Sequence, residues 1–138
     1  TGELVGYAMD SRMTKELVNR SLLQAVTKKC PARGLIHHSD RGSQYCAHEY
    51  RNLLDKLGII ASMSRKGNCY DNAPMESFWG TLKSELVHHI HYRSRNEAKQ
   101  EITEYIEVFY NRQRKQERLG YLSPVAYERL FYERKLAA

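Results

Sequence analysis

The sequence predicts an α/β fold, because short apolar runs typical of strands alternate with helical patterns along residues 1–90. Three runs are interpreted as short strands, at Glu3–Met9, Leu35–His38 and Ile59–Ser62. Between and after them, apolar residues recur every three or four positions, as in helices that bury one face. This alternation favours parallel pairing, at least between the two later strands.

Local start and stop signals mark the first two helices. Thr14 can cap a helix that runs to about Lys29, because a threonine hydroxyl accepts a bond from a free amide of the first turn. A second helix is expected over about Ala47–Leu57, with Gly58 as its stop. Its inward face is predicted to hold Tyr50, Leu53, Leu54 and Leu57.

The predicted fold is organised around Asn68–Leu86, a loop rich in polar residues that leads into a long helix. Asn72 or Asp71 can cap this helix, and Pro74 falls in the first turn, where a missing N–H group costs nothing. The spacing predicts one buried stripe, made of Met75, Trp79, Leu82 and Leu86.

The remainder of the chain is predicted to be helical. One helix is expected over about Asn96–Arg114, and its apolar face comprises Ala98, Ile102, Tyr105, Ile106 and Phe109. A turn at Arg118–Pro124 leads to a last helix that runs through Tyr132. We therefore divide the chain into a partial α/β core, residues 1–90, and a helical C-terminal extension of the same domain, residues 91–138.

Composition limits the class of protein. Of the 138 residues, 41% are hydrophobic and 28% charged, and no apolar run has the length of a membrane span. The net charge of +6 indicates a polyanionic partner, nucleic acid first. The cysteines are widely spaced, so we interpret them as reduced thiols of a cytoplasmic protein: Cys30, Cys46 and Cys69. A histidine cluster is interpreted as a solvated helix end rather than a metal site: His88, His89 and His91.

Two carboxylates stand out because of their places in the predicted fold. Asp40 directly follows a strand and Glu76 opens the long helix, with a gap of 35 residues between them. Neighbouring elements can bring the two together, and oxygen ligands of this kind suit Mg²⁺ or Mn²⁺. Two such ions can activate an attacking oxygen and stabilise a leaving oxygen at a phosphodiester. The alternative is an ordinary amphipathic helix with charged flanks, Glu76 and Lys83 among them.

Two segments together resemble the integrase core of bacterial insertion-sequence transposases of the OrfB type. His38–Tyr45 reads HSDRGSQY, and Gly67–Trp79 reads GNCYDNAPMESFW. The 35-residue gap is similar to the D,D(35)E spacing of that family and of retroviral integrases. Tyr110-Asn111 and Arg118–Pro124 also resemble this group, so the resemblance covers essentially the whole chain.

The resemblance implies a ribonuclease-H-like mixed sheet flanked by helices, and metal-dependent cleavage and joining of DNA strands during transposition. It implies that Asp40 and Glu76 are catalytic metal ligands, the second and third of three acids, at a two-metal site for Mg²⁺ or Mn²⁺. Lys83 matches a position where the family carries a basic residue that contacts the element's DNA end. The implied partners are insertion-element ends and target DNA, with a homo-oligomer assembled on DNA in the bacterial cytoplasm and no membrane.

The family's first catalytic aspartate precedes anything that matches Glu3–Met9. We therefore expect a truncated core that is catalytically inactive alone, with Glu3–Met9 as an exposed edge strand. Asp10 is interpreted as a turn or capping residue rather than a ligand, and Asp71 as a helix cap. Asp55, Glu85 and the acids of the tail are interpreted as solvated.

Basic residues near the two acids are candidates for DNA phosphate contacts: Lys83, Arg41, Lys66 and Arg65. The alternative for each is a generic basic surface, and Arg112–Arg118 is either a DNA track or a solvated helix end. Phe78 and Trp79 are interpreted as core residues rather than base-stacking groups. Two other functions stay open: a non-catalytic nucleic-acid-binding or assembly module that binds without metal, and a hydrolytic nuclease of the same fold.

Overall fold

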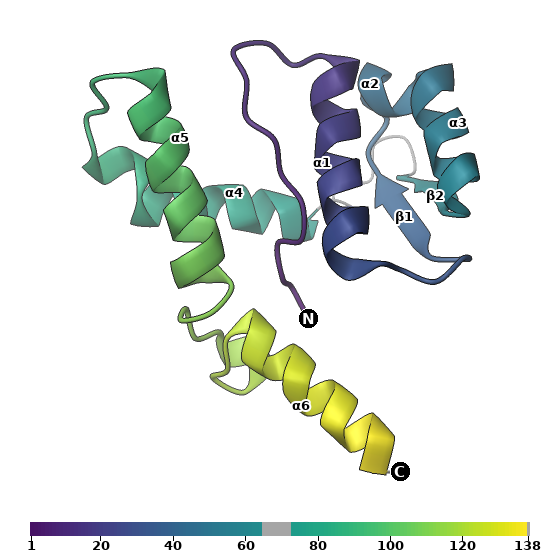
Figure 1. Ribbon diagram of the computed structural model, residues 1–138. Coiled ribbons are helices and arrows are strands. Elements are labelled where there is room, and N and C mark those ends of the chain that lie inside the picture. Colours follow the sequence, from purple (N-terminus) through teal and green to yellow (C-terminus); the bar gives the residue numbers. More distant parts are fainter. Residues whose placement is uncertain (65–72, 138) are drawn as a thin grey trace. The chain divides into compact units, whose positions relative to one another are not determined.

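The computed structural model describes residues 1–64 and 73–137 (Figure 1). The chain forms two compact units, one of Val5–Phe78 and one of Thr1–Leu4 with Trp79–Ala138. In chain order the elements are α1 (Lys15–Lys29), β1 (Ile36–Ser39), α2 (Ser43–Cys46), α3 (His48–Leu57), β2 (Ile60–Met63), α4 (Ala73–Glu85), η2 (Val87–His89), α5 (Arg95–Glu104), η3 (Tyr105–Tyr110), η4 (Glu117–Leu119) and α6 (Pro124–Ala137). Within the described ranges, every helix is too short or too polar to cross a lipid bilayer.

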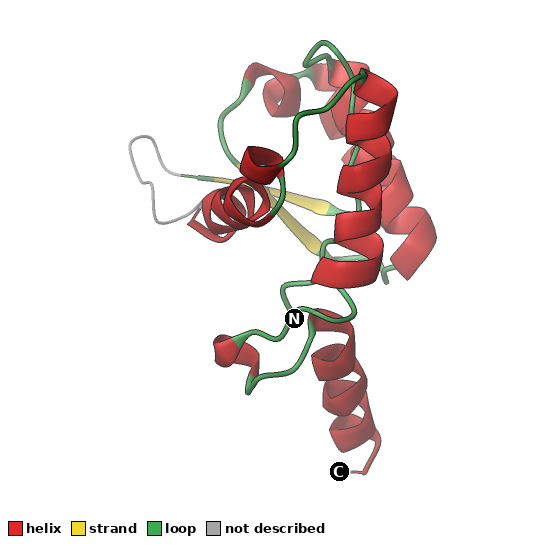
Figure 2. Cartoon of the chain, turned by 90° about the vertical axis from the view of Figure 1, so that its left-hand side faces the viewer, coloured by secondary structure: helices red, strands yellow, loops and turns green. Residues whose placement is uncertain are grey.

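The unit of Val5–Phe78 is built on β1 and β2, which pair in parallel with Ile36 opposite Ile60 (Figure 2). The predicted α/β class and the parallel pairing of the later strands are confirmed. Helices α1 and α3 supply most of its apolar core, which comprises Leu22, Tyr50, Leu54 and, just before β2, Ile59. In contrast, Ile36 and Ile60 are 66% and 55% exposed. The described sheet contains only this pair, so the mixed ribonuclease-H-like sheet stays a prediction.

The predicted helix signals act as expected in this unit. Thr14 caps α1, because its hydroxyl accepts a bond of 3.3 Å from the Leu17 amide. Gly58 ends α3 in the left-handed conformation, with φ of 70°, which a residue without Cβ adopts freely. Helix α2, a single turn, was not predicted from the sequence.

The predicted strand at Glu3–Met9 is wrong, since this segment is extended but unpaired with any strand of the described chain. It runs beside α1 instead (Figure 1). The Tyr7 amide donates to the side-chain oxygen of Gln24 at 2.7 Å. Gly6 lies so close to α1 that a Cβ atom there would collide with the Ser21 carbonyl. A side-chain hydrogen bond and close packing against α1 thus hold this segment, in place of the backbone hydrogen bonds between paired strands.

Helix α4 buries a different face from the predicted one. Pro74 occupies the first turn, as expected. Phe78 and Leu82 are buried, at 5% and 3% exposure, whereas Met75 and Trp79 are 41% and 49% exposed. The predicted stripe is therefore wrong for Met75 and Trp79, because the buried side of the helix is turned toward Phe78.

The helix that begins at Arg95 widens before it ends. Helix α5 passes directly into η3, a π-helical turn in which the Asn111 amide donates to the Ile106 carbonyl at 3.1 Å. The helix ends at Tyr110 rather than at Arg114, which corrects the predicted boundary. The wide turn also leaves Phe109 41% exposed, against the prediction that it is buried.

Asn111 anchors the N-terminus to the C-terminal unit. It is 1% exposed, and its side chain bonds both backbone groups of Leu4: Oδ1 accepts from the amide and Nδ2 donates to the carbonyl, each at 2.9 Å. Its own carbonyl accepts from the Val125 amide at 3.0 Å. Helix α6 follows as predicted and extends to Ala137, beyond the expected end at Tyr132.

An aromatic cluster lies between β1 and α3. His37 Nε2 is 2.8 Å from the Tyr50 hydroxyl, and the rings of Tyr45 and Tyr50 meet edge to face with centroids 5.5 Å apart. Burial lowers the pKa of His37, and the neighbouring His38 lowers it further. Burial also raises the pKa of Tyr50. His37 is therefore held uncharged in the folded state at neutral pH.

We expect His37 to make the unfolding free energy fall as the pH drops below about 7. Unfolded His37 takes up a proton near its ordinary pKa of 6.5, whereas the folded form resists protonation. Its contribution is therefore complete above this value and is lost as the pH falls from it through the lower pKa of the folded state. H37Q should flatten the pH dependence of the unfolding free energy, measured by urea denaturation. His91→Gln, at an exposed position, should leave that pH dependence unchanged. Equal slopes in wild type and H37Q would contradict the prediction.

Candidate functional site

Asp40 lies immediately after the last residue of β1, at the carboxyl end of the parallel pair. Its Oδ1 atom accepts a hydrogen bond of 2.8 Å from the Gly42 amide, which closes a tight turn. A Cβ atom at position 42 would lie 2.9 Å from that oxygen, so glycine allows the close approach. Asp40 is exposed, and Oδ2 bonds nothing in the part of the chain that the structure describes.

A polar network fixes the two strand ends beside Asp40. The His38 ring lies between two hydroxyls, with Nδ1 3.0 Å from Ser62 Oγ and Nε2 3.0 Å from Ser64 Oγ. The Ser64 amide continues the strand pairing by donating to the Ser39 carbonyl at 2.9 Å. Arg41 Nε donates to the Ser64 carbonyl at 2.9 Å, which leaves its terminal guanidinium groups for another partner.

Glu76 lies in the first turn of α4 and is exposed. It has no hydrogen-bond or ion-pair partner among residues 1–64 and 73–137. Asp40 and Glu76 both belong to the unit of Val5–Phe78, whereas Lys83, exposed in the last turn of α4, belongs to the other unit. Binding of one cation by both acids, and of DNA by Lys83, stays a prediction.

Several predicted residues lie in segment 65–72, outside the described residues: the phosphate contacts Arg65 and Lys66, the caps Asp71 and Asn72, and Cys69. Elsewhere, Cys30 and Cys46 are free and exposed. His89 contacts the Ser84 carbonyl through Nε2 at 2.7 Å. Among described residues, no group of three or more His, Cys, Asp or Glu side chains is arranged to hold a metal ion.

Asp10 has structural partners. Its Oδ1 accepts from the Ser11 amide at 2.7 Å, and its Oδ2 forms an ion pair of 2.9 Å with Arg20 of α1. These contacts agree with the interpretation of Asp10 as a turn residue rather than a metal ligand.

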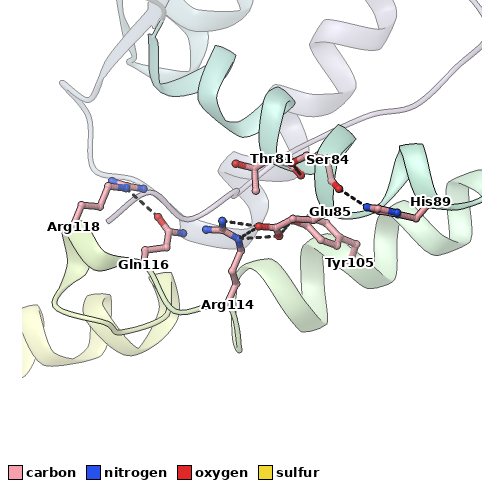
Figure 3. A network of polar contacts seen from close by, with 8 residues as sticks. All are labelled: Thr81, Ser84, Glu85, His89, Tyr105, Arg114, Gln116 and Arg118. Carbon is pink, nitrogen blue, oxygen red and sulfur yellow. Dashed lines mark hydrogen bonds and ion pairs between the residues drawn. The ribbon is translucent and has the colours of Figure 1, made fainter.

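Glu85 is not the solvated acid that the sequence suggested (Figure 3). Arg114 binds it in a fork, with Nε and one terminal nitrogen at 2.7–2.9 Å from the carboxylate oxygens. The Tyr105 hydroxyl donates to the same carboxylate at 2.6 Å. The hydrogen bonds from Arg114 lower the pKa of Glu85. The sequence gives only a weak signal for this cluster, because Glu85, Tyr105 and Arg114 come from three separate segments.

We expect Glu85 and Arg114 to couple by roughly 1 kcal/mol, a value reduced because both side chains are a quarter to a third exposed. A double-mutant cycle of E85Q and R114Q measures the coupling. Because the folded pKa of Glu85 is lowered, the coupling is full above the ordinary value of 4.5 and is lost as the pH falls through the folded pKa. The exposed pair Lys15–Glu49, also 2.7 Å apart, is the control and should show no measurable coupling. Equal coupling in both pairs would refute the prediction.

Two family models, both described as integrase core domain, match the chain: one over residues 1–69 and the other over residues 76–130. The junction between the two matches falls just before Glu76.

Named relatives align along most of the chain. The chain is 57% identical over 133 residues to "Insertion element IS600 uncharacterized 31 kDa protein" of Shigella sonnei, covering 96% of the chain and 49% of that protein. It is 50% identical over 127 residues to "Transposase for insertion sequence element IS904" of Lactococcus lactis, covering 92% and 50%. It is 41% identical over 125 residues to "Transposase InsF for insertion sequence IS3A" of Escherichia coli, covering 91% and 43%. The chain thus spans about half the length of these relatives.

Proposed function

Since the chain belongs to the integrase core domain family, we propose that it is part of a transposase catalytic domain that cleaves and joins DNA strands with divalent metal ions. Two relatives are named transposases, and they support this reading of the family. The observation that carries the proposal is the pair of exposed carboxylates at element ends: Asp40 directly after β1, and Glu76 in the first turn of α4.

The donor set of the two acids suits Mg²⁺ or Mn²⁺. These ions need only one or two carboxylates, with water and phosphate oxygens as further ligands. Asp40 offers Oδ2, since the Gly42 amide occupies Oδ1, and Glu76 offers a carboxylate without a described protein partner. Bound ions would supply Lewis-acid activation of the attacking and leaving oxygens.

The basic residues supply the electrostatic part of the proposal. Arg41 is held by its Nε atom, so its terminal groups can bind a phosphate in a fixed direction. Lys83 carries a point charge seven residues after Glu76 on the same helix, two turns away. Their partners would be insertion-element ends and target DNA, with copies of the protein assembled on DNA in the bacterial cytoplasm.

The metal site is tested with Fe²⁺ bound in place of Mg²⁺. Ascorbate and peroxide then generate radicals that cut the polypeptide near the ion, and the fragments map the site. We expect cuts beside Asp40 and beside Glu76 in the 138-residue chain. D40N and E76Q should each remove both sets of cuts and weaken Mn²⁺ binding, measured by electron paramagnetic resonance, by at least about tenfold.

The matched controls are Asp55→Asn and Glu104→Gln, which change two exposed acids on other helices. Both variants should be cut at the same positions as the wild-type chain. Cuts that survive in D40N or E76Q would refute the metal assignment. DNA binding that needs no metal and survives E76Q, together with absent cuts, would favour the non-catalytic module. With Mg²⁺ and labelled DNA ends, we expect the chain alone to show neither nicking nor strand transfer.

A further inference from the structure

Ser64 is buried at the end of the strand pair and bonds the residues on both sides of Asp40. It is 6% exposed and directly follows Met63, the last residue of β2. Its amide donates to the Ser39 carbonyl at 2.9 Å, and its hydroxyl donates to the same oxygen at 3.3 Å. Its carbonyl accepts from Arg41 Nε at 2.9 Å. One residue of the neighbouring strand end thus holds the chain before and after Asp40.

These bonds fix the backbone that carries the Asp40 side chain. The Ser39 carbonyl belongs to the planar peptide group that joins Ser39 to Asp40, so the two donors from Ser64 set the orientation of that peptide. At the carboxylate itself, the Gly42 amide donates to Oδ1 at 2.8 Å. The direction of Asp40 Oδ2 therefore depends on the backbone that Ser64 holds and on the bond from Gly42.

The hydroxyl of Ser64 has a second partner, the ring of His38. Ser64 Oγ lies 3.0 Å from His38 Nε2, and its single proton is already donated to the Ser39 carbonyl. The hydroxyl therefore accepts from Nε2, which carries the proton of the neutral ring. His38 Nδ1 is then bare and accepts from the Ser62 hydroxyl, 3.0 Å away. The three bonds form one directed chain that ends at the backbone beside Asp40.

We propose that His38 and Ser64 are positioning residues, which hold the Asp40 carboxylate in the direction that metal binding requires. His38 acts through Ser64, because its Nε2–H group turns the hydroxyl so that the hydroxyl proton points at the Ser39 carbonyl. Hydrogen bonds that orient a metal ligand commonly contribute about 10–100-fold to metal affinity. The assignment rests on the proposed function for the identity of the ion, whereas the hydrogen-bond chain needs no metal.

The hydrogen-bond chain is tested by NMR of the 138-residue protein in EDTA. At about pH 8, above the ordinary histidine pKa, the ¹⁵N shifts of the His38 ring should show a protonated Nε2 and a bare Nδ1. The amide signal of Gly42 reports the Asp40 carboxylate that it bonds. In Ser64→Ala this signal should move toward its position in Asp40→Ala. A bare Nε2, or a Gly42 signal that Ser64→Ala leaves in place, would overturn the proposal.

Two replacements of His38 separate the roles of its ring nitrogens. Glutamine places an amide N–H group where Nε2 lies and can donate to Ser64, whereas asparagine reaches only the position of Nδ1, next to Ser62. His38→Gln should therefore keep the wild-type Gly42 signal, and His38→Asn should move it as Ser64→Ala does. Equal Gly42 signals in these two variants would contradict the proposal. Since His38 is exposed, this pair keeps the test valid if Ser64→Ala unfolds, which circular dichroism checks.

Binding of Mn²⁺, measured by electron paramagnetic resonance, tests the link to the metal. Ser64→Ala and His38→Asn should weaken binding by roughly 10-fold, whereas Ser64→Thr and His38→Gln should restore most of the affinity. The matched control is Ser84→Ala, because the Ser84 hydroxyl is exposed and donates to the Thr81 carbonyl of its own helix. This variant should bind Mn²⁺ as the wild-type chain does. Equal affinities in Ser64→Ala and Ser84→Ala would refute the positioning role.

Failure of this proposal is distinct from failure of the proposed function. A wild-type chain that binds no Mn²⁺ and shows no Fe²⁺ cuts would refute the metal site, while the NMR signals in EDTA would still decide whether His38 and Ser64 hold Asp40. A wild-type chain that binds Mn²⁺ no more tightly than Ser64→Ala would refute the positioning role alone.

Discussion

Replacing Asn111 by alanine is expected to lower the unfolding free energy by about 2–4 kcal/mol, because two backbone groups of Leu4 lose their partner together. The cost is high since Asn111 is only 1% exposed, so water cannot replace the lost side chain. Urea denaturation measures the loss. Hydrogen exchange locates it, because the Leu4 amide should lose its protection.

The control for this change is Asn96→Ala, at an exposed position in α5. Its effect should stay within about 0.5 kcal/mol. A Leu4 amide that stays protected in Asn111→Ala would show that the N-terminus is held in another way.

Leu54→Ala is expected to cost the unit of Val5–Phe78 about 2–5 kcal/mol. Leu54 is 2% exposed and packs in one cluster with Leu22, Tyr50 and Ile59. Alanine would leave a cavity where α1, α3 and the start of β2 meet. Hydrogen exchange of the α3 amides measures the change within this unit alone.

Leu136→Ala, at a position that is 88% exposed, removes the same atoms without a cavity and should have little effect. If Leu54→Ala were equally mild, the core of this unit would have to lie elsewhere.

The sequence predicted the helices where their signals are local. Thr14 and Gly58 act through atoms within one turn, so position along the chain is enough to identify them. The strand at Glu3–Met9 failed because a strand needs a partner from a distant segment. An apolar run can equally lie extended against a helix, as Gly6 does against α1.

Burial was harder to predict than helix formation. Met75 with Trp79 has the four-residue spacing of one helix face, and so has Phe78 with Leu82. Only packing from outside α4 decides which of the two pairs is buried. The candidate site shows the same limit. Asp40 and Glu76 were placed correctly at element ends, while the partners of Glu85 come from remote segments that no spacing rule connects.

The wide turn at Tyr105–Tyr110 also determines where the chain tolerates a change in length. Deleting one residue there would let regular α-helical geometry close. Later residues would keep their direction, because the wide turn holds the one extra residue. The same deletion within the regular helix Arg95–Glu104 would rotate every later residue by about 100° and shift it about 1.5 Å along the axis, so Asn111 would turn away from Leu4. Homologous chains should therefore lose one residue within Tyr105–Tyr110 more readily than within Arg95–Glu104.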